Sequence, residues 1–404
     1  MNNRRICWLL LLLVLALLAP AAPSKAATPG YRTGFARWRA ADAGFERWQT
    51  SGTARATDGT LRLDLAGAAS GSDPYPAGGY EGHSYYNGSN FRVGEALGPI
   101  VPTGFAASEA IASWNATTPP GTWLETLVRA RIGTRWTKWY SLGVWASDSS
   151  TVERHSVGGQ ADADGTVRVD TLVLGKKTRA DALQLKLRLF SANEATPAVR
   201  NAGLAFSTAP ARPARLAPGT PARWGRSLAV PSCSQMVYPD GGEVWCSPTA
   251  TSMVLGYWDR DAGPCAPRVA AAVDGVYDWR YGGHGNWSFN VAYAAGAERE
   301  GYVARFSSLA QVEPWVAAGV PVVISYAWRK GTLSGAPAGS SSGHIAVLAG
   351  FDAKGNPVVN DPAAADDASV QRVYNRAQLE RLWLEHSGGT VYLIFPADAD
   401  MPVL

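Results

Sequence analysis

The chain has 404 residues and a formal net charge of +4, with 46% hydrophobic and 17% charged residues. Such a length holds two or three compact domains, and the apolar content excludes disorder over most of the chain. The 43 glycines, 26 prolines and 16 tryptophans favour short strands and turns over a helical bundle. The small, scattered positive charge argues against a nucleic-acid partner.

The N-terminus has the pattern of a secretory signal peptide. Arg4 and Arg5 precede an apolar run over residues 6–18, and small residues follow up to Ala26. We expect cleavage near Ala26, so that residues 1–26 form the signal peptide. The run is shorter than the roughly 20 residues that cross a bilayer, which leaves a retained membrane anchor as the alternative. The sequence therefore predicts a secreted protein, extracellular or periplasmic, with no membrane span after cleavage.

Residues 30–208 alternate apolar and polar side chains in the manner of β-strands. The strand-like segments are Leu61–Leu65, Trp123–Val128, Trp139–Trp145, Val167–Val173 and Leu183–Leu189. We predict an all-β sandwich domain over residues 30–208. Residues 209–227 are rich in proline and lack a periodic apolar pattern, so they form a predicted linker.

The remaining residues, 228–404, have a mixed pattern. Helices are predicted at residues 246–258, 267–275, 288–300, 307–318 and 375–385, and strands at residues 320–326, 344–351, 357–360 and 390–395. A hairpin turn at residues 352–356 joins the second and third of these strands. Helices followed by an antiparallel sheet indicate an α+β domain.

Three cysteines remain after signal cleavage, and an odd number in an oxidising compartment leaves one thiol free. Cys246 lies at the start of a predicted helix, where the backbone dipole and free N–H groups favour the thiolate. Cys233 and Cys265 lie in a loop and a turn, and we predict a disulfide between them. Cys246 is therefore the candidate nucleophile, with an inert buried thiol as the alternative.

A cysteine nucleophile needs a base and a group that orients the base. His344 opens an apolar strand, and Asp361 ends the next predicted strand, so that the two side chains can meet. A structural histidine and a turn aspartate are the alternatives. Gln235 precedes Cys246 by eleven positions and can direct its amide to the same oxyanion as the Cys246 N–H, with an ordinary surface glutamine as the alternative.

Ordered motifs around these residues resemble the C39-like cysteine peptidases, in particular the secreted stand-alone branch with a papain-like fold. The motifs are Val230–Gln235 leading to Cys246–Trp258, then Tyr281–Asn290, Gly343–Asp352 and Asn360–Pro362. The resemblance covers about residues 228–396. It implies a cysteine nucleophile, a glutamine in the oxyanion hole, a histidine base and an orienting aspartate, carried by Cys246, Gln235, His344 and Asp361. Neither a cofactor nor a metal is expected.

Further positions follow from the same resemblance. The family usually has glycine after the nucleophile, whereas this chain has Ser247, whose side chain is expected to crowd the acyl group. Asn286 and Trp287 match the family and are expected to line the substrate cleft, with a packed tryptophan at a helix start as the alternative. The segment Ser113–Trp123 resembles the β-rich domain that often precedes such peptidases in secreted bacterial proteins.

The predicted function is a secreted cysteine peptidase that hydrolyses peptide or related amide bonds in a peptide or protein substrate. One alternative is an acyl-transferring or cell-wall-modifying thiol enzyme with the same three residues. The other is a catalytically inert binding protein whose sandwich binds carbohydrate, such as a cell-wall polymer, or peptide. Trp136, Trp139 and Trp145 are the candidate stacking surfaces for that role, and packing in the core is the competing interpretation of these side chains.

Overall fold

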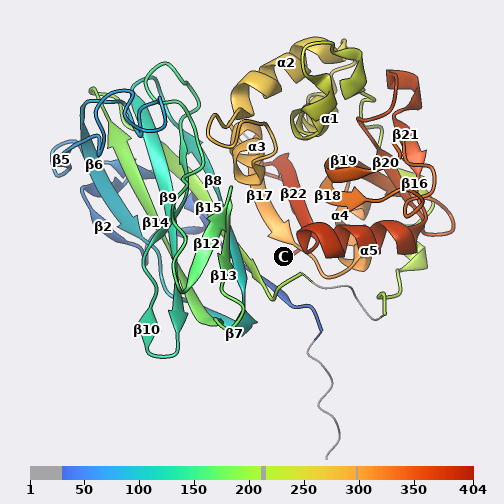
Figure 1. Ribbon diagram of the computed structural model, residues 1–404, viewed down its shortest axis with the longest axis horizontal. Helices are drawn as coiled ribbons and strands as arrows, with labels where there is room; N and C mark the ends of the chain where they lie inside the picture. Colours follow the sequence, from blue (N-terminus) through green and yellow to red (C-terminus); the bar gives the residue numbers. More distant parts are fainter. Residues whose placement is uncertain (1–29, 211–214, 297–298) are drawn as a thin grey trace, which may run out of the picture. The chain divides into compact units, whose positions relative to one another are not determined.

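The computed structural model describes residues 30–210, 215–296 and 299–404, and the predicted signal peptide, residues 1–26, lies outside these ranges. The described chain comprises a β-rich N-terminal domain and a C-terminal domain in which helices flank a sheet (Figure 1). Within the described ranges, no helix is long and apolar enough to cross a membrane.

Two antiparallel sheets form the N-terminal domain. The first sheet has the order β12-β13-β8-β15-β4-β3, with β1 also beside β15. Its strands are β1 (Thr33–Arg39), β3 (Thr53–Arg55), β4 (Leu61–Leu63), β8 (Glu109–Thr117), β12 (Gly165–Arg168), β13 (Thr171–Leu174) and β15 (Ala198–Ser207). The second sheet has the order β10-β9-β14-β6-β2, with β11 beside β9, β5 beside β6 and β7 beside β14. Its strands are β2 (Gln49–Ser51), β5 (Ala69–Ser72), β6 (Asn90–Leu97), β7 (Val101–Ala107), β9 (Thr122–Ile132), β10 (Arg135–Trp136), β11 (Tyr140–Trp145) and β14 (Ala180–Ser191).

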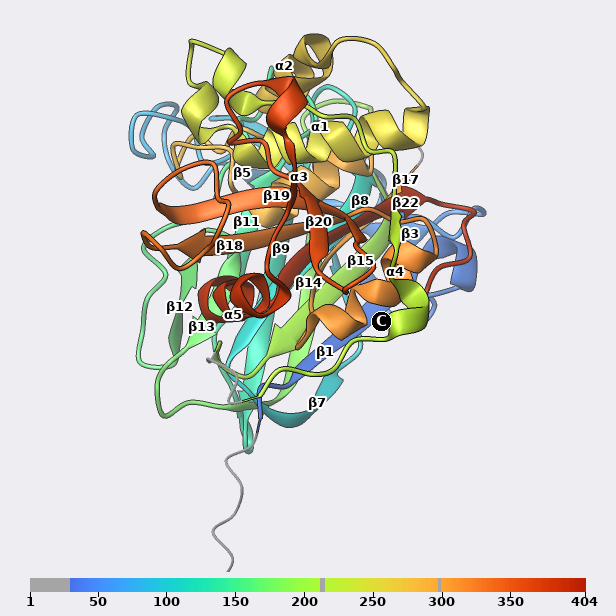
Figure 2. The ribbon, with the colours of Figure 1, turned by 90° about the vertical axis from the view of Figure 1, so that its right-hand side faces the viewer.

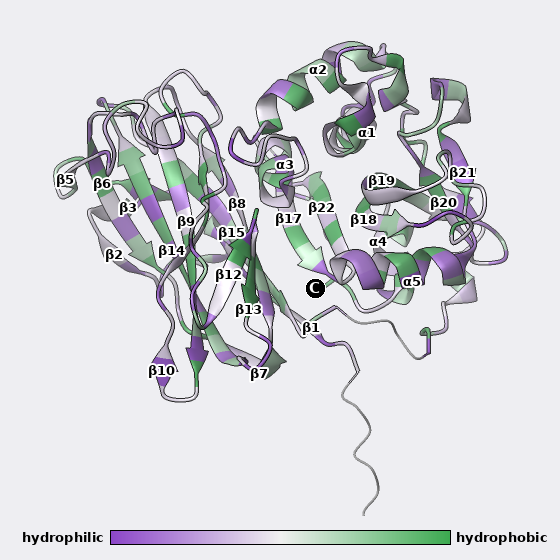
Figure 3. Ribbon diagram, viewed as in Figure 1, coloured by the Kyte–Doolittle hydropathy of each residue, from purple (hydrophilic) through white to green (hydrophobic). Residues whose placement is uncertain are grey.

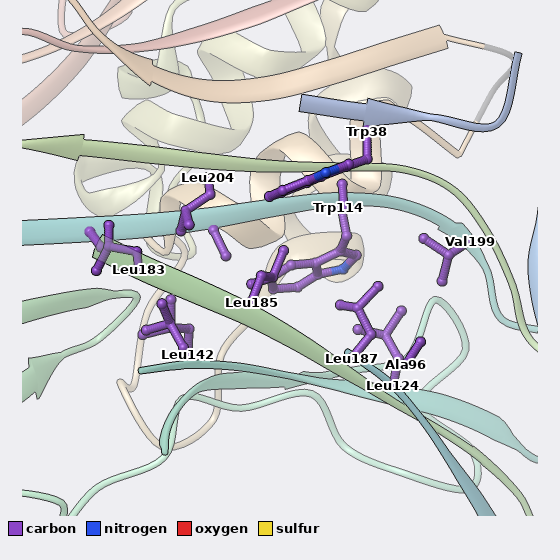
Figure 4. Close-up of a cluster of buried hydrophobic side chains, with 14 of the residues drawn as sticks. Trp38, Ala96, Trp114, Leu124, Leu142, Leu183, Leu185, Leu187, Val199 and Leu204 are labelled. Carbon is purple, nitrogen blue, oxygen red and sulfur yellow. The ribbon is translucent and has the colours of Figure 1, made fainter. Parts of the chain in front are cut away.

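The two sheets share one hydrophobic core, which makes this domain a β-sandwich (Figure 4). Trp114 and Leu204 come from the first sheet, whereas Leu124, Leu185 and Leu187 come from the second, and all five are buried. Apolar and polar residues alternate along strands such as β9 and β14 (Figure 3). This alternation accounts for the arrangement, because alternate side chains of a strand point to the same face.

One predicted strand is a hairpin in the structure. Residues 167–173 alternate like a single strand, but β12 ends at Arg168 and pairs antiparallel with β13, which begins at Thr171. Val169 forms the turn with a positive φ of 57°, a conformation that a β-branched residue rarely adopts. The turn places Asp170 between the two strands.

The sheet of the C-terminal domain has the order β17-β22-β18-β19-β20-β21, with β16 beside β19. Its strands are β16 (Arg226–Ser227), β17 (Arg299–Arg305), β18 (Val322–Trp328), β19 (Ser341–Phe351), β20 (Pro357–Asn360), β21 (Gln371–Val373) and β22 (Thr390–Pro396). Helices α1 (Cys246–Asp259), α2 (Cys265–Val276) and α3 (Trp287–Ala294) share one core cluster with the sheet, and α4 (Glu313–Ala317) and α5 (Arg376–Ser387) share another (Figure 2). Along β19, Ala346 and Leu348 belong to one cluster and Val347 to the other, as expected for a sheet covered on both faces.

The predicted helix over residues 288–300 is wrong in its second half. Helix α3 ends at Ala294, and β17 begins at Arg299 and pairs with β22 along its length. Long-range pairing therefore determines the structure of residues 299–305. The predicted helix over 307–318 is also shorter in the structure, where a 3-10 turn at Leu309–Gln311 precedes α4.

Part of the predicted linker packs against the C-terminal domain. The Thr220 N–H and the Trp224 indole N–H both donate to the carboxylate of Glu313, at 2.7 and 2.8 Å. Residues 226–227 then add strand β16 to the sheet beside β19. These contacts fix residues 220–227 to the C-terminal domain.

The two domains also share a hydrophobic cluster. Phe289 and Ala292 of α3 belong to the core of the N-terminal domain. The Phe289 ring lies 5.3 Å from the Trp145 ring and 6.2 Å from the Trp114 ring, measured between centroids. Trp145 is therefore a core residue, as one of the two sequence-based interpretations expected.

Candidate active site

The candidate nucleophile, Cys246, is the first residue of α1. It is a free, half-buried thiol. Ala250, Met253 and Val254 on the same helix are fully buried and anchor α1 in the core of the C-terminal domain. Because the first N–H groups of a helix have no partner within the helix, the Cys246 amide is free to donate to a bound group.

His344 and Asp361 meet in the structure. β19 and β20 are antiparallel neighbours with Val347 opposite Asn360, so that His344 near the start of β19 lies beside Asp361, directly after β20. The distance from His344 Nε2 to Asp361 Oδ1 is 2.7 Å, and both side chains are buried. The order and spacing in the sequence thus lead to the side-chain contact that they suggested.

The second ring nitrogen of His344 is available to the thiol. The Cys246 thiol lies close enough to the His344 ring to raise the pKa of that ring, and the engagement of Nε2 with Asp361 leaves Nδ1 for the thiol. The rings of Tyr326 and Trp328 pack edge-on against the imidazole at 5.5 and 5.4 Å between centroids, which restricts its orientation.

Two tyrosines that sequence reasoning missed complete the surroundings of Asp361. The hydroxyls of Tyr326 and Tyr374 donate to Asp361 Oδ2 at 2.9 and 2.7 Å, and the Ala363 N–H donates to Oδ1 at 3.0 Å. Tyr326 pairs directly opposite His344 across β18 and β19. A tyrosine at the end of the strand that neighbours the histidine was the available signal, but its partner could not be read from the sequence.

Electrostatic interactions within this group favour a charged pair. Burial raises the pKa of Asp361, but the His344 ring and the two tyrosine hydroxyls lower it further, so that the pKa of Asp361 lies below its usual value. Burial alone would lower the pKa of His344, whereas Asp361 and the contact with Cys246 raise it, and the net pKa of His344 lies above its usual value. Both directions favour an imidazolium beside a carboxylate.

Gln235 lies in a 3-10 turn, Gln235–Val237, and only 2% of it is exposed. Its Nε2 donates to the Gly242 carbonyl at 2.8 Å, and the same carbonyl accepts the Trp245 N–H at 3.0 Å. The Gln235 amide is therefore attached to the turn that leads directly into Cys246. One Nε2 hydrogen remains for a further acceptor, because a side-chain amide carries two.

The segment that carries Gln235 is also attached to the segment that carries Asp361. The Gln235 N–H donates to the Pro362 carbonyl at 2.8 Å, and Asn360 Nδ2 donates to the Val230 carbonyl at 3.0 Å. The disulfide between Cys233 and Cys265 links this segment to the start of α2, with 5.7 Å between the two Cα atoms. Residues 360–362 thus include Asp361 and, through Asn360 and Pro362, also hold the segment that carries Gln235.

The residues expected to line the substrate cleft lie in different environments. Ser247 is buried and its hydroxyl lies 2.9 Å from the hydroxyl of Tyr392, so it points into the domain. Asn286 is buried and accepts the Phe289 N–H at 3.1 Å, which caps α3. Trp287 is half-buried. Tyr281, which was not singled out from the sequence, is 49% exposed and lies within electrostatic range of Cys246.

Within the described ranges, no group of three or more His, Cys, Asp and Glu side chains is placed to hold a metal ion. The chemistry that the arrangement supports is nucleophilic attack by the thiol, with His344 as the acid and base and Asp361 as its orienting partner.

Comparisons with known families agree with this class of protein. Residues 34–207 match the family model described as "Peptidase C39 N-terminal domain", and residues 227–391 match the one described as "Peptidase_C39 like family". The fold and these matches define a two-domain, cysteine peptidase-like protein. Residues 227–391 therefore belong to the C39-like peptidase family, preceded by a domain that matches the N-terminal domain model over residues 34–207.

Other comparisons add little. No curated protein matches the chain. Among solved structures, a family two carbohydrate esterase from Cellvibrio japonicus matches with a TM-score of 0.18 and 12% sequence identity, over 46% of this chain and 38% of that chain. A similarity at this level supports no conclusion about fold or function.

Proposed function

We propose that this protein is a secreted cysteine peptidase that hydrolyses peptide or related amide bonds, with a papain-like arrangement of its C-terminal domain. The observation that carries the proposal is the buried His344–Asp361 pair, 2.7 Å apart, whose ring interacts with the free thiol at the start of α1. A buried ion pair beside a half-exposed cysteine is the arrangement that activates a thiol nucleophile.

The proposed reaction has two steps. In the first, the Cys246 thiolate attacks the substrate carbonyl carbon, the C–N bond breaks, and the His344 imidazolium gives its proton to the leaving amine. In the second, His344 takes a proton from a water molecule that attacks the thioester, and the acid product leaves as the thiol is restored. Asp361 stays ionised throughout and holds the imidazole in the orientation that both proton transfers need.

The proposed oxyanion donors are the Cys246 backbone N–H and the remaining Nε2 hydrogen of Gln235. The Gly242 carbonyl fixes the Gln235 amide before substrate binds, so little reorganisation is required during the reaction. Gln235→Ala is expected to lower kcat by on the order of 10² to 10³ with little change in substrate binding, as observed for loss of one oxyanion donor elsewhere.

A peptide substrate is supported by the surface around these residues. Met236, Val237 and Val244 lie on the two turns between Gln235 and Cys246, and they are 48%, 49% and 60% exposed. Exposed apolar side chains grouped beside a nucleophile are suited to contact the side chains of an extended peptide.

The binding alternative receives less support. Trp145 lies in the core, and the Arg129 guanidinium lies 4.4 and 4.6 Å from the ring centroids of Trp136 and Trp139. Lys186 also lies 4.7 Å from the Trp139 centroid. Because cations occupy part of the face of each of these rings, less of that face is open for stacking on a sugar of a cell-wall polymer.

The experiment compares the wild-type chain with Cys246→Ala and His344→Ala on a mixture of casein peptides and with iodoacetamide as a thiol label. Both variants are expected to lose hydrolysis, and mass spectrometry should find the iodoacetamide adduct on Cys246 of the wild type. Asp181→Ala, at an exposed position of the N-terminal domain where the side chain pairs with Arg131, is the control and should keep wild-type rates.

Two outcomes would change the proposal. Hydrolysis that survives in Cys246→Ala excludes this residue as the nucleophile. Products in which an added amine replaces water in the wild-type reaction, with no free acid formed, assign the protein to the acyl-transferring alternative.

A further inference from the structure

The N-terminal domain contributes a buried carboxylate to the C-terminal domain next to the candidate active site. Asp170 lies in the turn between β12 and β13 and is 4% exposed. Its Oδ2 accepts the Trp287 N–H at 2.5 Å, and its Oδ1 accepts the Thr171 hydroxyl at 2.9 Å. Trp287 is the first residue of α3, so Asp170 holds the start of that helix from the other domain.

A second contact between the two domains lies at Asp278, at the start of the loop that leads into α3. Asp278 is fully buried, and its Oδ1 accepts the Ser156 N–H of the N-terminal domain at 3.0 Å. The same oxygen accepts the Tyr281 N–H at 3.1 Å, and Oδ2 accepts Asn286 Nδ2 at 2.9 Å. Residues 278–287, named here the Tyr281 loop, are therefore held at both ends by the N-terminal domain.

The Tyr281 loop lies beside the nucleophile. The His284 ring of this loop lies 6.1 Å from the ring of Trp245, the residue before Cys246, measured between centroids. Tyr281 is 49% exposed, and burial and then the charge of Cys246 raise the pKa of its hydroxyl. Helix α3, which continues the loop, contacts the nucleophile helix through the hydrogen bond from the Thr251 hydroxyl to Asn290 Oδ1, 3.1 Å long. An exposed tyrosine in a loop that packs against the residue before the thiol is placed to contact a bound substrate.

We propose that Asp170 is a positioning residue for the substrate-binding surface, and that through it the N-terminal domain fixes the Tyr281 loop beside Cys246. The proposal rests on the proposed function, because the position of Tyr281 matters for turnover only if Cys246 reacts with a bound substrate. It gives the N-terminal domain a structural share in substrate binding in place of a separate binding activity.

The thiol chemistry itself is independent of this contact. His344 and Asp361 lie on β19 and directly after β20, and their hydrogen bonds come from residues 326, 363 and 374. None of these residues belongs to the Tyr281 loop. Loss of Asp170 should therefore weaken the binding of an extended substrate while the intrinsic reactivity of the thiol is kept, since a small displacement of binding groups is enough to lower productive binding.

The experiment uses the full chain and two electrophiles of different size. Iodoacetamide reports the reactivity of the thiol, and a dipeptidyl vinyl sulfone reports binding beside it through its half-saturating concentration. The variants are Asp170→Ala, which removes the acceptor for the Trp287 N–H, and Asp170→Asn, which keeps one acceptor oxygen. Asp181→Ala is the control, because Asp181 is exposed and pairs with Arg131 in the same domain, away from the Tyr281 loop.

In Asp170→Ala, the half-saturating concentration of the vinyl sulfone should rise about tenfold or more, while the iodoacetamide rate stays within about twofold of wild type. Asp170→Asn should give a smaller rise, and Asp181→Ala none. Equal effects on the two electrophiles, or no effect on either, would overturn the proposal. If Asp170→Ala does not fold, the same comparison on Asp170→Asn decides.

Hydrogen–deuterium exchange separates this proposal from the proposed function. Amides of residues 278–287 should exchange faster in Asp170→Ala than in wild type and Asp181→Ala, whether or not the protein cleaves peptides. Unchanged exchange there rejects the positioning role. A wild type that shows neither hydrolysis nor labelling of Cys246 rejects the proposed function instead.

Discussion

Asp361 and Asp170 are two buried carboxylates whose surroundings have opposite effects. Asp361 lies beside the His344 ring and accepts hydrogen bonds from two tyrosine hydroxyls, and its pKa is lowered despite burial. Asp170 accepts the Trp287 N–H and the Thr171 hydroxyl, and burial raises its pKa to about 6. The desolvation of the two carboxylates acts in the same direction, so the partner decides the outcome: a cationic ring stabilises the charge at Asp361.

The negative charge is the important property of Asp361, whereas the position of an oxygen acceptor is the important property of Asp170. At Asp361 the negative charge is what stabilises the imidazolium of His344. At Asp170 the useful feature is an oxygen acceptor at the correct position for the start of α3, and ionisation is unfavourable there. Arg305 is the cation within electrostatic range of Asp170, but it pairs directly with Glu109.

The largest expected effect is the loss of kcat when the charge of Asp361 is removed. Asp361→Asn keeps the size of the side chain but removes the charge that holds the imidazolium, so kcat should fall by on the order of 10² to 10⁴ with a small change in KM. Steady-state hydrolysis of a peptide by the purified variant measures it. A kcat within a few-fold of wild type would show that Asp361 does not support a charged His344.

Much of the candidate site could be predicted because its parts have local signals. Cys246 stands where a helix begins, and His344 and Asp361 are joined by a hairpin with a recognisable turn. For the tyrosine hydroxyls on Asp361, the sequence offered at most Tyr326 at a strand end, and it could not indicate their partner, since Tyr326 and Tyr374 reach Asp361 from separate segments. A contact that depends on the final sheet order is not written in any short stretch of sequence.

The same limit explains the errors in the fold. The valines at 167 and 173 alternate as in one strand, yet the chain reverses at Val169 and Asp170, where no glycine or proline marks the turn. The continuation of the predicted helix past Ala294 failed because residues 299–305 pair with β22, which lies far along the chain. The contact between Asp170 and Trp287 spans 117 positions, so the role of the N-terminal domain was open at the level of sequence.

A second prediction concerns the pH dependence of stability. The pKa of Asp170 is raised from 3.8 to about 6, so its contribution to stability is fully present below the unfolded value and is lost as the pH rises through about 6. That difference corresponds to about 3 kcal/mol. The free energy of unfolding of wild type, relative to Asp170→Asn, should therefore fall by about this amount between about pH 4 and pH 7.

Urea unfolding of both proteins at several pH values measures this difference. Subtracting the free energy of unfolding of Asp170→Asn from that of the wild type cancels the contributions of groups that titrate equally in both. The groups that face Asp170 are Arg305, Tyr281 and Tyr392, and the pKa of each is raised, so none of them titrates in this window. A difference between the two chains that is independent of pH would show that Asp170 titrates at its ordinary value in the folded protein.

The smallest effect is expected at the periphery of Asp361. Tyr374→Phe removes one hydroxyl that donates at 2.7 Å, and Asp361 still accepts from His344, Tyr326 and Ala363. Because no buried group is left without a partner, the loss in the free energy of unfolding should be about 1.5 kcal/mol, at the lower end for a hydrogen bond to a charged acceptor.

This loss should be largest near neutral pH and shrink as the pH falls, because a lowered carboxyl pKa stabilises the fold only above the pH at which Asp361 is protonated. Urea unfolding at pH 7 and at about pH 2, where folded Asp361 becomes protonated, tests both parts, with the exposed Tyr75→Phe as the control. An equal loss at both pH values would mean that Tyr374 acts through packing and not through the charge on Asp361.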